Sequence, residues 1–130
     1  MQREIINNIN IIYGKIEELC TSVKRDKNEI TLIAVSKKKS HELIEIALNN
    51  GIENFGENYA QELKEKSFLI NSEKIIWHFI GPIQSNKVKI IANHADWIHS
   101  LEREKIIKKL DTECKKINKT INACLQVNIS

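Results

Sequence analysis

The sequence has little of what marks several protein classes. Its 130 residues include one proline, four widely spaced glycines and three cysteines. A glycine-rich phosphate loop needs several glycines within a few residues, so none is present. Cys20, Cys114 and Cys124 form no CxxC pair, which argues against a disulfide scaffold or zinc module and predicts a reducing, cytoplasmic setting. No apolar run approaches the ~20 residues of a membrane span, and no signal-peptide core follows Met1, so we expect no membrane partner.

The sequence also lacks a large excess of charge of either sign. Lysine and arginine total 20 against 17 aspartates and glutamates, which gives a formal net charge of +3. This excess is too small to indicate nucleic acid as a partner. We interpret the frequent lysine, isoleucine and asparagine as compositional drift. Hydrophobic residues make up 42% of the chain, which together with its length predicts one globular domain over residues 1–130.

Short apolar runs alternate along the chain with helical patterns. Nearly continuous apolarity predicts strands at residues 30–35, 52–56, 75–80, 97–100 and 121–129. Apolar spacings of three or four predict helices between them, with Ser40 and Ser85 as N-caps and Gly51 as a stop. Strands that alternate with helices in such short units predict an α/β fold with a parallel sheet.

Two of the predicted helices have a defined apolar face. A helix before the first strand carries Ile5, Ile9, Ile12, Ile16 and Leu19 at helical spacing. The last helix, residues 102–117, is expected to turn Ile106, Leu110 and Ile117 inward. We expect both helices to pack these faces on the sheet or on each other.

Polar residues gather where the predicted strands end. They are Lys37, Glu57, Asn58, Gln84, Asn86 and Asn128, together with Gly81. Parallel α/β folds bind ligands at the carboxyl ends of their strands. The distribution therefore predicts a binding site at that edge of the sheet without naming its chemistry.

Lys37 is the candidate reactive residue among them. Side chains alternate along a strand, so Ile33, Val35 and Lys37 share one face. At the mouth of a barrel the amine would lose solvation beside Lys38, which favours the neutral nucleophile that forms a Schiff base with an aldehyde. On the residues alone, a solvated basic loop at positions 37–39 is the favoured interpretation.

Four segments resolve this choice because they occur together and in order. They are Leu-Ile-Ala-Val-Ser-Lys at 32–37, Asn-Phe-Gly-Glu-Asn-Tyr at 54–59, Trp-His-Phe-Ile-Gly-Pro-Ile-Gln-Ser-Asn-Lys at 77–87, and Gln-Val-Asn-Ile-Ser at 126–130. With them the chain resembles, over essentially its whole length, the pyridoxal phosphate homeostasis protein family. Its members are single-domain relatives of the alanine racemase N-terminal domain.

The resemblance implies a fold, a cofactor and a site. The fold is a pyridoxal 5′-phosphate (PLP)-binding (β/α)8 TIM barrel, of which this chain holds about the first five βα units. Lys37 would carry PLP as a Schiff base, Asn58 would contact the cofactor, and His78 would point into the barrel. Glu57 is expected to be a buried polar brace between strands. Such proteins bind PLP for intracellular homeostasis without established turnover and supply it to PLP-dependent client enzymes.

The chain also departs from the family pattern. Lys38, Ser40 and Glu102 replace the residues that usually follow the lysine segment and the fourth strand. The resemblance places the phosphate-binding positions beyond the last residue given, so we expect weak PLP affinity and self-association through open sheet edges. Three alternatives stay open: a truncated relict without specific PLP binding, a PLP-dependent amino-acid racemase, and a noncatalytic interaction or nucleic-acid protein.

No metal site is predicted. His94, Asp96 and His99 are close in sequence, but their spacing is not that of a helical metal pair. We interpret the two histidines as isolated surface and core residues.

Overall fold

The computed structural model describes residues 1–129, and its elements alternate as predicted. A long helix α1 (Gln2–Ser22) and a short 3-10 turn η1 (Lys27–Glu29) precede the first strand. The strands are β1 (Ile33–Val35), β2 (Asn54–Glu57), β3 (Ile76–Phe79), β4 (Trp97–Leu101) and β5 (Asn122–Leu125). The helices between them are α2 (His41–Asn49), α3 (Ala60–Leu69), α4 (Val88–His94) and α5 (Glu104–Lys116), with a 3-10 turn η2 (Ser85–Lys87) before α4.

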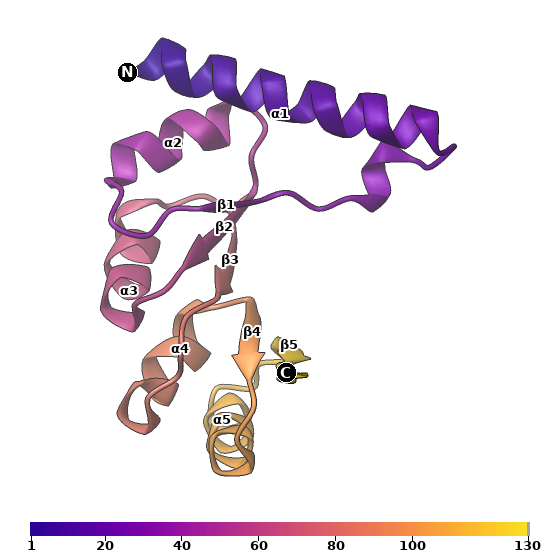
Figure 1. Ribbon diagram of the computed structural model, residues 1–130. Coiled ribbons are helices and arrows are strands. Elements are labelled where there is room, and N and C mark those ends of the chain that lie inside the picture. The colour runs from indigo at the N-terminus through magenta and orange to yellow at the C-terminus, as the bar shows by residue number, and fades with distance from the viewer. Residues whose placement is uncertain (130) are drawn as a thin grey trace.

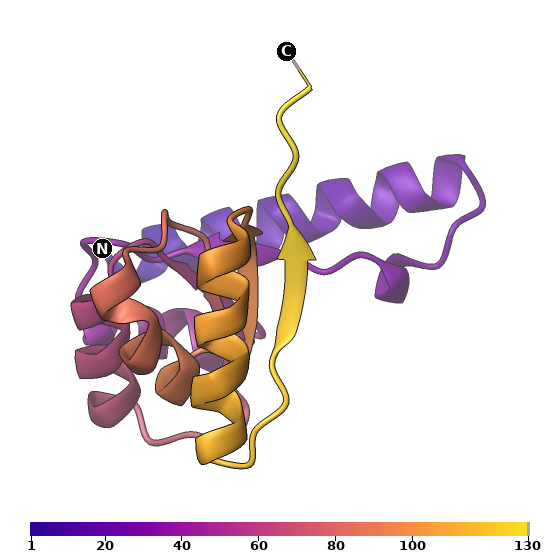
Figure 2. The same cartoon turned by 90° about the horizontal axis from the view of Figure 1, so that it is seen from below.

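The five strands form one parallel sheet in the order β1-β2-β3-β4-β5. Helices α3, α4 and α5 lie together on one side of this sheet, and β5 forms its edge (Figures 1 and 2). Sequential parallel strands with helices between them are the arrangement of a (β/α) barrel wall. The predicted fold class is therefore confirmed, with five strands of such a wall present.

The core lies between the sheet and the helices. Side chains alternate along each strand, so one set of residues faces the helices. In this set Phe55, Phe79 and Ile98 are at most 2% exposed, and from the helices Leu63 and Ile91 are fully buried against them. The opposite face carries no helix over β1, where Val35 remains 55% exposed.

Local signals fixed the ends of α2 correctly. The Ser40 hydroxyl accepts a hydrogen bond from the backbone N–H of Leu43, as an N-cap does. Gly51, two residues beyond the helix, has a φ of 97°, a left-handed conformation that favours glycine.

Two predicted details of the helices before β4 were wrong. Ile12 and Leu19 on α1 are exposed, because the buried residues of this helix are Ile9, which was predicted, and Cys20, which was not. Ser85 does not cap α4: it begins η2, and its hydroxyl accepts a hydrogen bond from Lys109 of α5.

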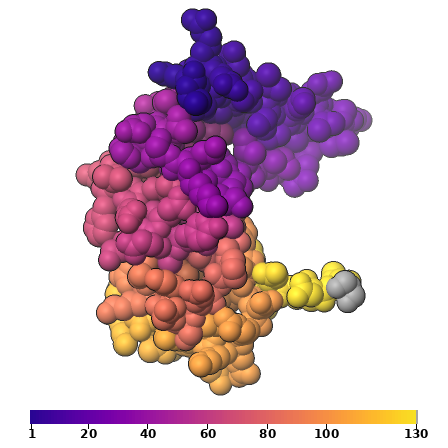
Figure 3. Space-filling view, turned by 60° about the vertical axis from the view of Figure 1, so that its left-hand side comes forward, coloured from indigo at the N-terminus to yellow at the C-terminus, as the bar shows by residue number. Residues whose placement is uncertain are grey.

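The end of the chain also differs from the sequence prediction. Ile117 lies just after α5 and is 40% exposed, while Cys114 takes the inward position. The last strand stops at Leu125. Gln126 still donates to the Leu101 carbonyl of β4, and residues 127–129 project away from the sheet (Figures 2 and 3), so Asn128 is exposed and does not join the other strand ends. Across residues 1–129, no helix is long and apolar enough to cross a membrane.

Candidate binding site at the carboxyl ends of the strands

Lys37 and Asn58 lie just beyond the carboxyl ends of β1 and β2. Val35, the last residue of β1, pairs with Gly56 of β2, and the backbone N–H of Ser36 donates to the Gly56 carbonyl. Lys37 then lies in a turn, and its contact with a ligand together with Asn58 stays a prediction. The predicted loss of solvation at Lys37 does not occur in this five-strand sheet, where the residue is exposed.

Asn58 is held by close packing of the neighbouring loop. A Cβ added to Gly81 would lie 2.2 Å from the carbonyl oxygen of Asn58, so only glycine lets the loop after β3 approach this closely. Ser100 of β4 donates a hydrogen bond to the Gly81 carbonyl. The ends of three strands are therefore tied together. Among the described residues, the buried Asn58 Oδ1 has no hydrogen-bond partner.

His78 lies on the sheet face opposite α3 and α4, and both its ring nitrogens have partners. Nδ1 is 2.8 Å from Nε2 of His99, and Nε2 is 2.8 Å from Oδ1 of Asn54. The ring is 3% exposed and stacks on Trp97 with 5.9 Å between centroids. Because the Asn54 oxygen only accepts, Nε2 of His78 carries the proton and Nδ1 accepts from His99.

The environment of His78 disfavours its charged form. Burial, and secondly the neighbouring His99, lower the pKa of His78 from 6.5 to about 4. The ring is therefore neutral at pH 7. It has the geometry of a satisfied interior histidine, and its direct contact with a cofactor stays a prediction.

The structure confirms the prediction that Glu57 is a buried polar brace between strands. Its side chain is fully buried on the helix side of the sheet and receives Lys66 Nζ of α3 at 2.9 Å from Oε1. The Ser36 hydroxyl donates to its other oxygen. Burial raises the pKa of the Glu57 carboxyl, and the Ser36 and Lys66 hydrogen bonds oppose that rise.

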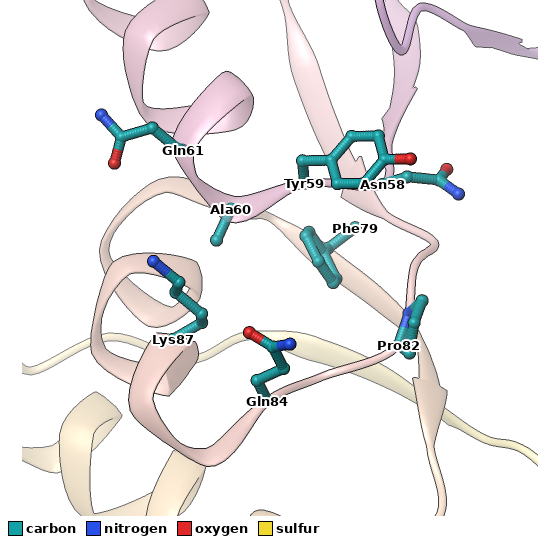
Figure 4. Close-up of a pocket in the computed structure, with 8 residues that line it drawn as sticks. All are labelled: Asn58, Tyr59, Ala60, Gln61, Phe79, Pro82, Gln84 and Lys87. Carbon is teal, nitrogen blue, oxygen red and sulfur yellow. The ribbon is translucent and has the colours of Figure 1, made fainter.

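A cleft of about 370 Å³ opens beside these residues, between the start of α3 and the loop that leads into α4. Phe79 lies in its centre, with Lys87 and Gln84 along one side and Tyr59 above (Figure 4). The Asn58 amide points away from Lys87 in this view (Figure 4). Gln84, one of the predicted site residues, thus lines the cleft on the helix side of the strand ends.

Sequence reasoning missed two residues of this region. Lys66 was read only as part of a helix, yet it continues the buried stripe of Ala60, Leu63 and Ile70 at helical spacing. A lysine in such a stripe signals a buried acceptor. His99 was interpreted as isolated, and the structure instead pairs it with His78.

The sequence spacing of His94, Asp96 and His99 predicts no metal site. In the structure each of these side chains has another polar partner. Asp96 Oδ2 accepts from the backbone N–H of Trp77 at 2.8 Å, and His94 Nδ1 lies 3.0 Å from the Ser67 hydroxyl. Within residues 1–129, no group of three or more potential ligands is arranged to hold a metal ion.

The five sequential parallel strands with helices between them define the class, which is a (β/α) barrel-type fold. No protein-family model matches the chain. Curated relatives do match. The chain is 42% identical over 128 residues to the pyridoxal phosphate homeostasis protein of Haemophilus influenzae, covering 97% of this chain and 54% of that protein. It is 40% identical over 126 residues to the one of Pseudomonas aeruginosa, covering 97% and 55%.

Solved structures agree. PipY of Synechococcus elongatus with PLP bound superimposes with a TM-score of 0.77 at 33% identity, covering 88% of this chain and 55% of that one. PipY without PLP gives the same TM-score at 32% identity, covering 88% and 54%. The chain is therefore a homologue of the pyridoxal phosphate homeostasis proteins, and it spans about half the length of the curated relatives it matches.

Proposed function

We propose that the chain binds pyridoxal 5′-phosphate through the amine of Lys37 and serves PLP homeostasis by holding the cofactor, without turnover of its own. The observation that carries the proposal is the position of Lys37 and Asn58 just beyond the carboxyl ends of the paired strands β1 and β2. The names of the relatives and the PLP-bound PipY structure support it. The proposed partners are PLP itself and client enzymes that take it up.

The residues at this edge fit the cofactor in two respects. PLP supplies an aldehyde, which condenses with a primary amine and releases one water. Lys37 offers an exposed primary amine that makes no ion pair with any residue between 1 and 129. Asn58 offers a buried acceptor oxygen without a partner, which a hydrogen-bond donor of the cofactor would satisfy.

The other predicted residue has an indirect role in this proposal. His78 is neutral and bonded to Asn54 on β2, so it supports the strand that leads to Asn58. We propose that it maintains the shape of the open sheet face near Lys37, and that its neutral ring takes up no second proton at pH 7.

Trapping with borohydride tests the role of Lys37. The protein is mixed with substoichiometric PLP, reduced, and mapped by mass spectrometry. We expect one dominant adduct on Lys37 that disappears in Lys37→Ala and persists in Lys39→Ala, a control that removes an equally exposed positive charge two residues away. Adducts spread over many lysines would overturn the proposal. Racemisation of amino acids, assayed with saturating PLP, would instead indicate an enzyme.

Asn58→Ala tests the second contact. Its side-chain oxygen has no partner in the described chain, so truncation breaks no hydrogen bond there. We expect normal folding by circular dichroism and about fivefold weaker PLP capture, the loss that one neutral hydrogen bond of ~1 kcal/mol corresponds to. Unchanged capture would remove Asn58 from the site.

A further inference from the structure

A buried charged cluster lies directly behind Lys37, on the helix side of the sheet. Glu57, Lys66 and Ser36 are each at most 5% exposed. The Lys66 ammonium has three N–H donors and three acceptor groups: the Glu57 carboxylate at 2.9 Å, the Ser36 carbonyl at 2.7 Å and Glu62 Oε1 at 3.1 Å. Every proton of this buried lysine therefore has a partner.

The cluster holds the backbone on both sides of Lys37. Before it, the Ser36 carbonyl accepts from Lys66, and the Ser36 hydroxyl donates to Glu57. After it, the backbone N–H of Lys38 donates to Glu62 Oε1 at 2.6 Å. Lys37 is thus the residue between two attachment points that both lead to α3.

The turn that carries Lys37 needs this support. The N–H of Lys39 donates to the Ser36 carbonyl, which closes a turn with Lys37 and Lys38 at its centre. Lys38 has a φ of 60°, a left-handed conformation that costs a residue with a side chain roughly 1–2 kcal/mol. The charge-assisted bond from its N–H to Glu62 offsets that cost.

We propose that Glu57, Lys66 and Glu62 form a positioning cluster for Lys37: through Ser36 and Lys38 they fix the turn that directs its amine to the open sheet face. This inference rests on the proposed function. An apolar pair would fill the same space at a lower desolvation cost, and the two buried charges instead supply hydrogen bonds to the backbone. The cluster holds Ser36 before Lys37 and the N–H of Lys38 after it, so the backbone that carries the Lys37 side chain is fixed on both sides.

Glu62 is the member to change, because its side chain is 26% exposed and its removal leaves the Glu57–Lys66 pair intact. Glu62→Ala removes the acceptor for the Lys38 N–H. Glu62→Gln keeps an acceptor oxygen and is the rescue variant. Glu65→Ala is the matched control on the same helix, since within residues 1–129 Glu65 accepts a hydrogen bond only from Gln61 and none from the turn.

Two measurements distinguish a role of Glu62 in positioning Lys37 from a general effect on the stability of the fold. Amide hydrogen exchange at Lys38, measured without PLP, is expected to speed up about tenfold or more in Glu62→Ala, the factor for loss of a charged hydrogen bond. The share of borohydride-trapped PLP on Lys37 is expected to fall at least severalfold. Glu62→Gln and Glu65→Ala should stay close to the wild type in both, with unchanged circular dichroism in all three.

The outcomes distinguish this inference from the proposed function. If the wild type concentrates PLP on Lys37 and Glu62→Ala does so equally, the positioning role is overturned while the proposed function stands. Equal losses in Glu62→Ala and Glu65→Ala would overturn it as well. If the wild type spreads its adducts over many lysines, the proposed function fails and the positioning role falls with it, whatever the exchange at Lys38 shows.

Discussion

The unusual titration of His78 makes stability at mildly acid pH the sharpest test of the site's electrostatics. Its pKa is about 4 in the folded chain, against 6.5 as the ordinary value. Below pH 6.5 His78 is protonated in the unfolded chain, whereas in the folded chain it stays neutral down to about pH 4. The contribution of His78 to the free energy of unfolding is therefore complete above pH 6.5 and is lost as the pH falls from 6.5 to 4. Linkage gives a loss of about 2 kcal/mol between pH 7 and pH 5.

Urea unfolding of the wild type and of His78→Gln at both pH values measures this loss. Other groups titrate in both proteins, including His94, whose pKa burial also lowers, so they largely cancel in the difference. We expect the free energy of unfolding to fall between pH 7 and pH 5 by about 2 kcal/mol more in the wild type than in the variant. Equal slopes, or a His78 ring resonance that titrates near pH 6.5 by NMR, would refute the account of a buried neutral imidazole.

Two further changes probe the packing around the site. Gly81→Ala should lower the free energy of unfolding by about 1–3 kcal/mol, because the added Cβ meets the Asn58 carbonyl. Gly14→Ala, in open space on α1, should instead raise it by about 0.5–1 kcal/mol. A Gly81→Ala variant as stable as the wild type in urea or thermal unfolding would contradict the close approach of the loop. Lys119→Met should lower the free energy of unfolding by about 1–3 kcal/mol, since the Lys119 amine donates to two carbonyls at the end of α4. The control Lys116→Met, on the exposed side of α5, should change it by under about 0.5 kcal/mol. Equal effects of the two substitutions would count against buried hydrogen bonding at Lys119.

The fold was predictable because its signals are local. Apolar runs of four to six residues, a serine before α2 and a glycine after it lie within a few positions of the elements they define. The sequence predictions were wrong where contacts between residues far apart in the chain determine the structure. Ser85 has the chemistry of an N-cap, yet its hydroxyl is taken by Lys109 of α5. Ile12 fits the helical period of α1, but the α2 surface extends over only part of that helix.

The positions of Lys37 and Asn58 were predictable from the sequence, whereas the contacts of Lys66 and His99 were not. Lys37 and Asn58 stand at strand ends, which periodicity locates. Lys66 lies 30 positions from the Ser36 carbonyl that it binds, and His99 lies 21 from His78. No spacing rule connects residues that far apart, so these pairs become visible only once the register of neighbouring strands is known. A charged residue within an otherwise apolar helix stripe is the one signal that could have identified Lys66.

The two sides of the sheet differ: buried hydrogen bonds lie on the helix side, and the other side is open. On the helix side, Glu57 and Lys66 exchange hydration for a closed set of hydrogen bonds, which is rigid because no partner can leave without exposing a buried charge. Under the proposed function, the Lys37 amine must stay accessible to a small aldehyde. Ser36 and Lys37 are consecutive, so the buried hydrogen bonds at Ser36 act on Lys37 through a single peptide unit. A network that bonded Lys37 Nζ directly would position it equally well but would occupy the atom that the proposed function requires to be free.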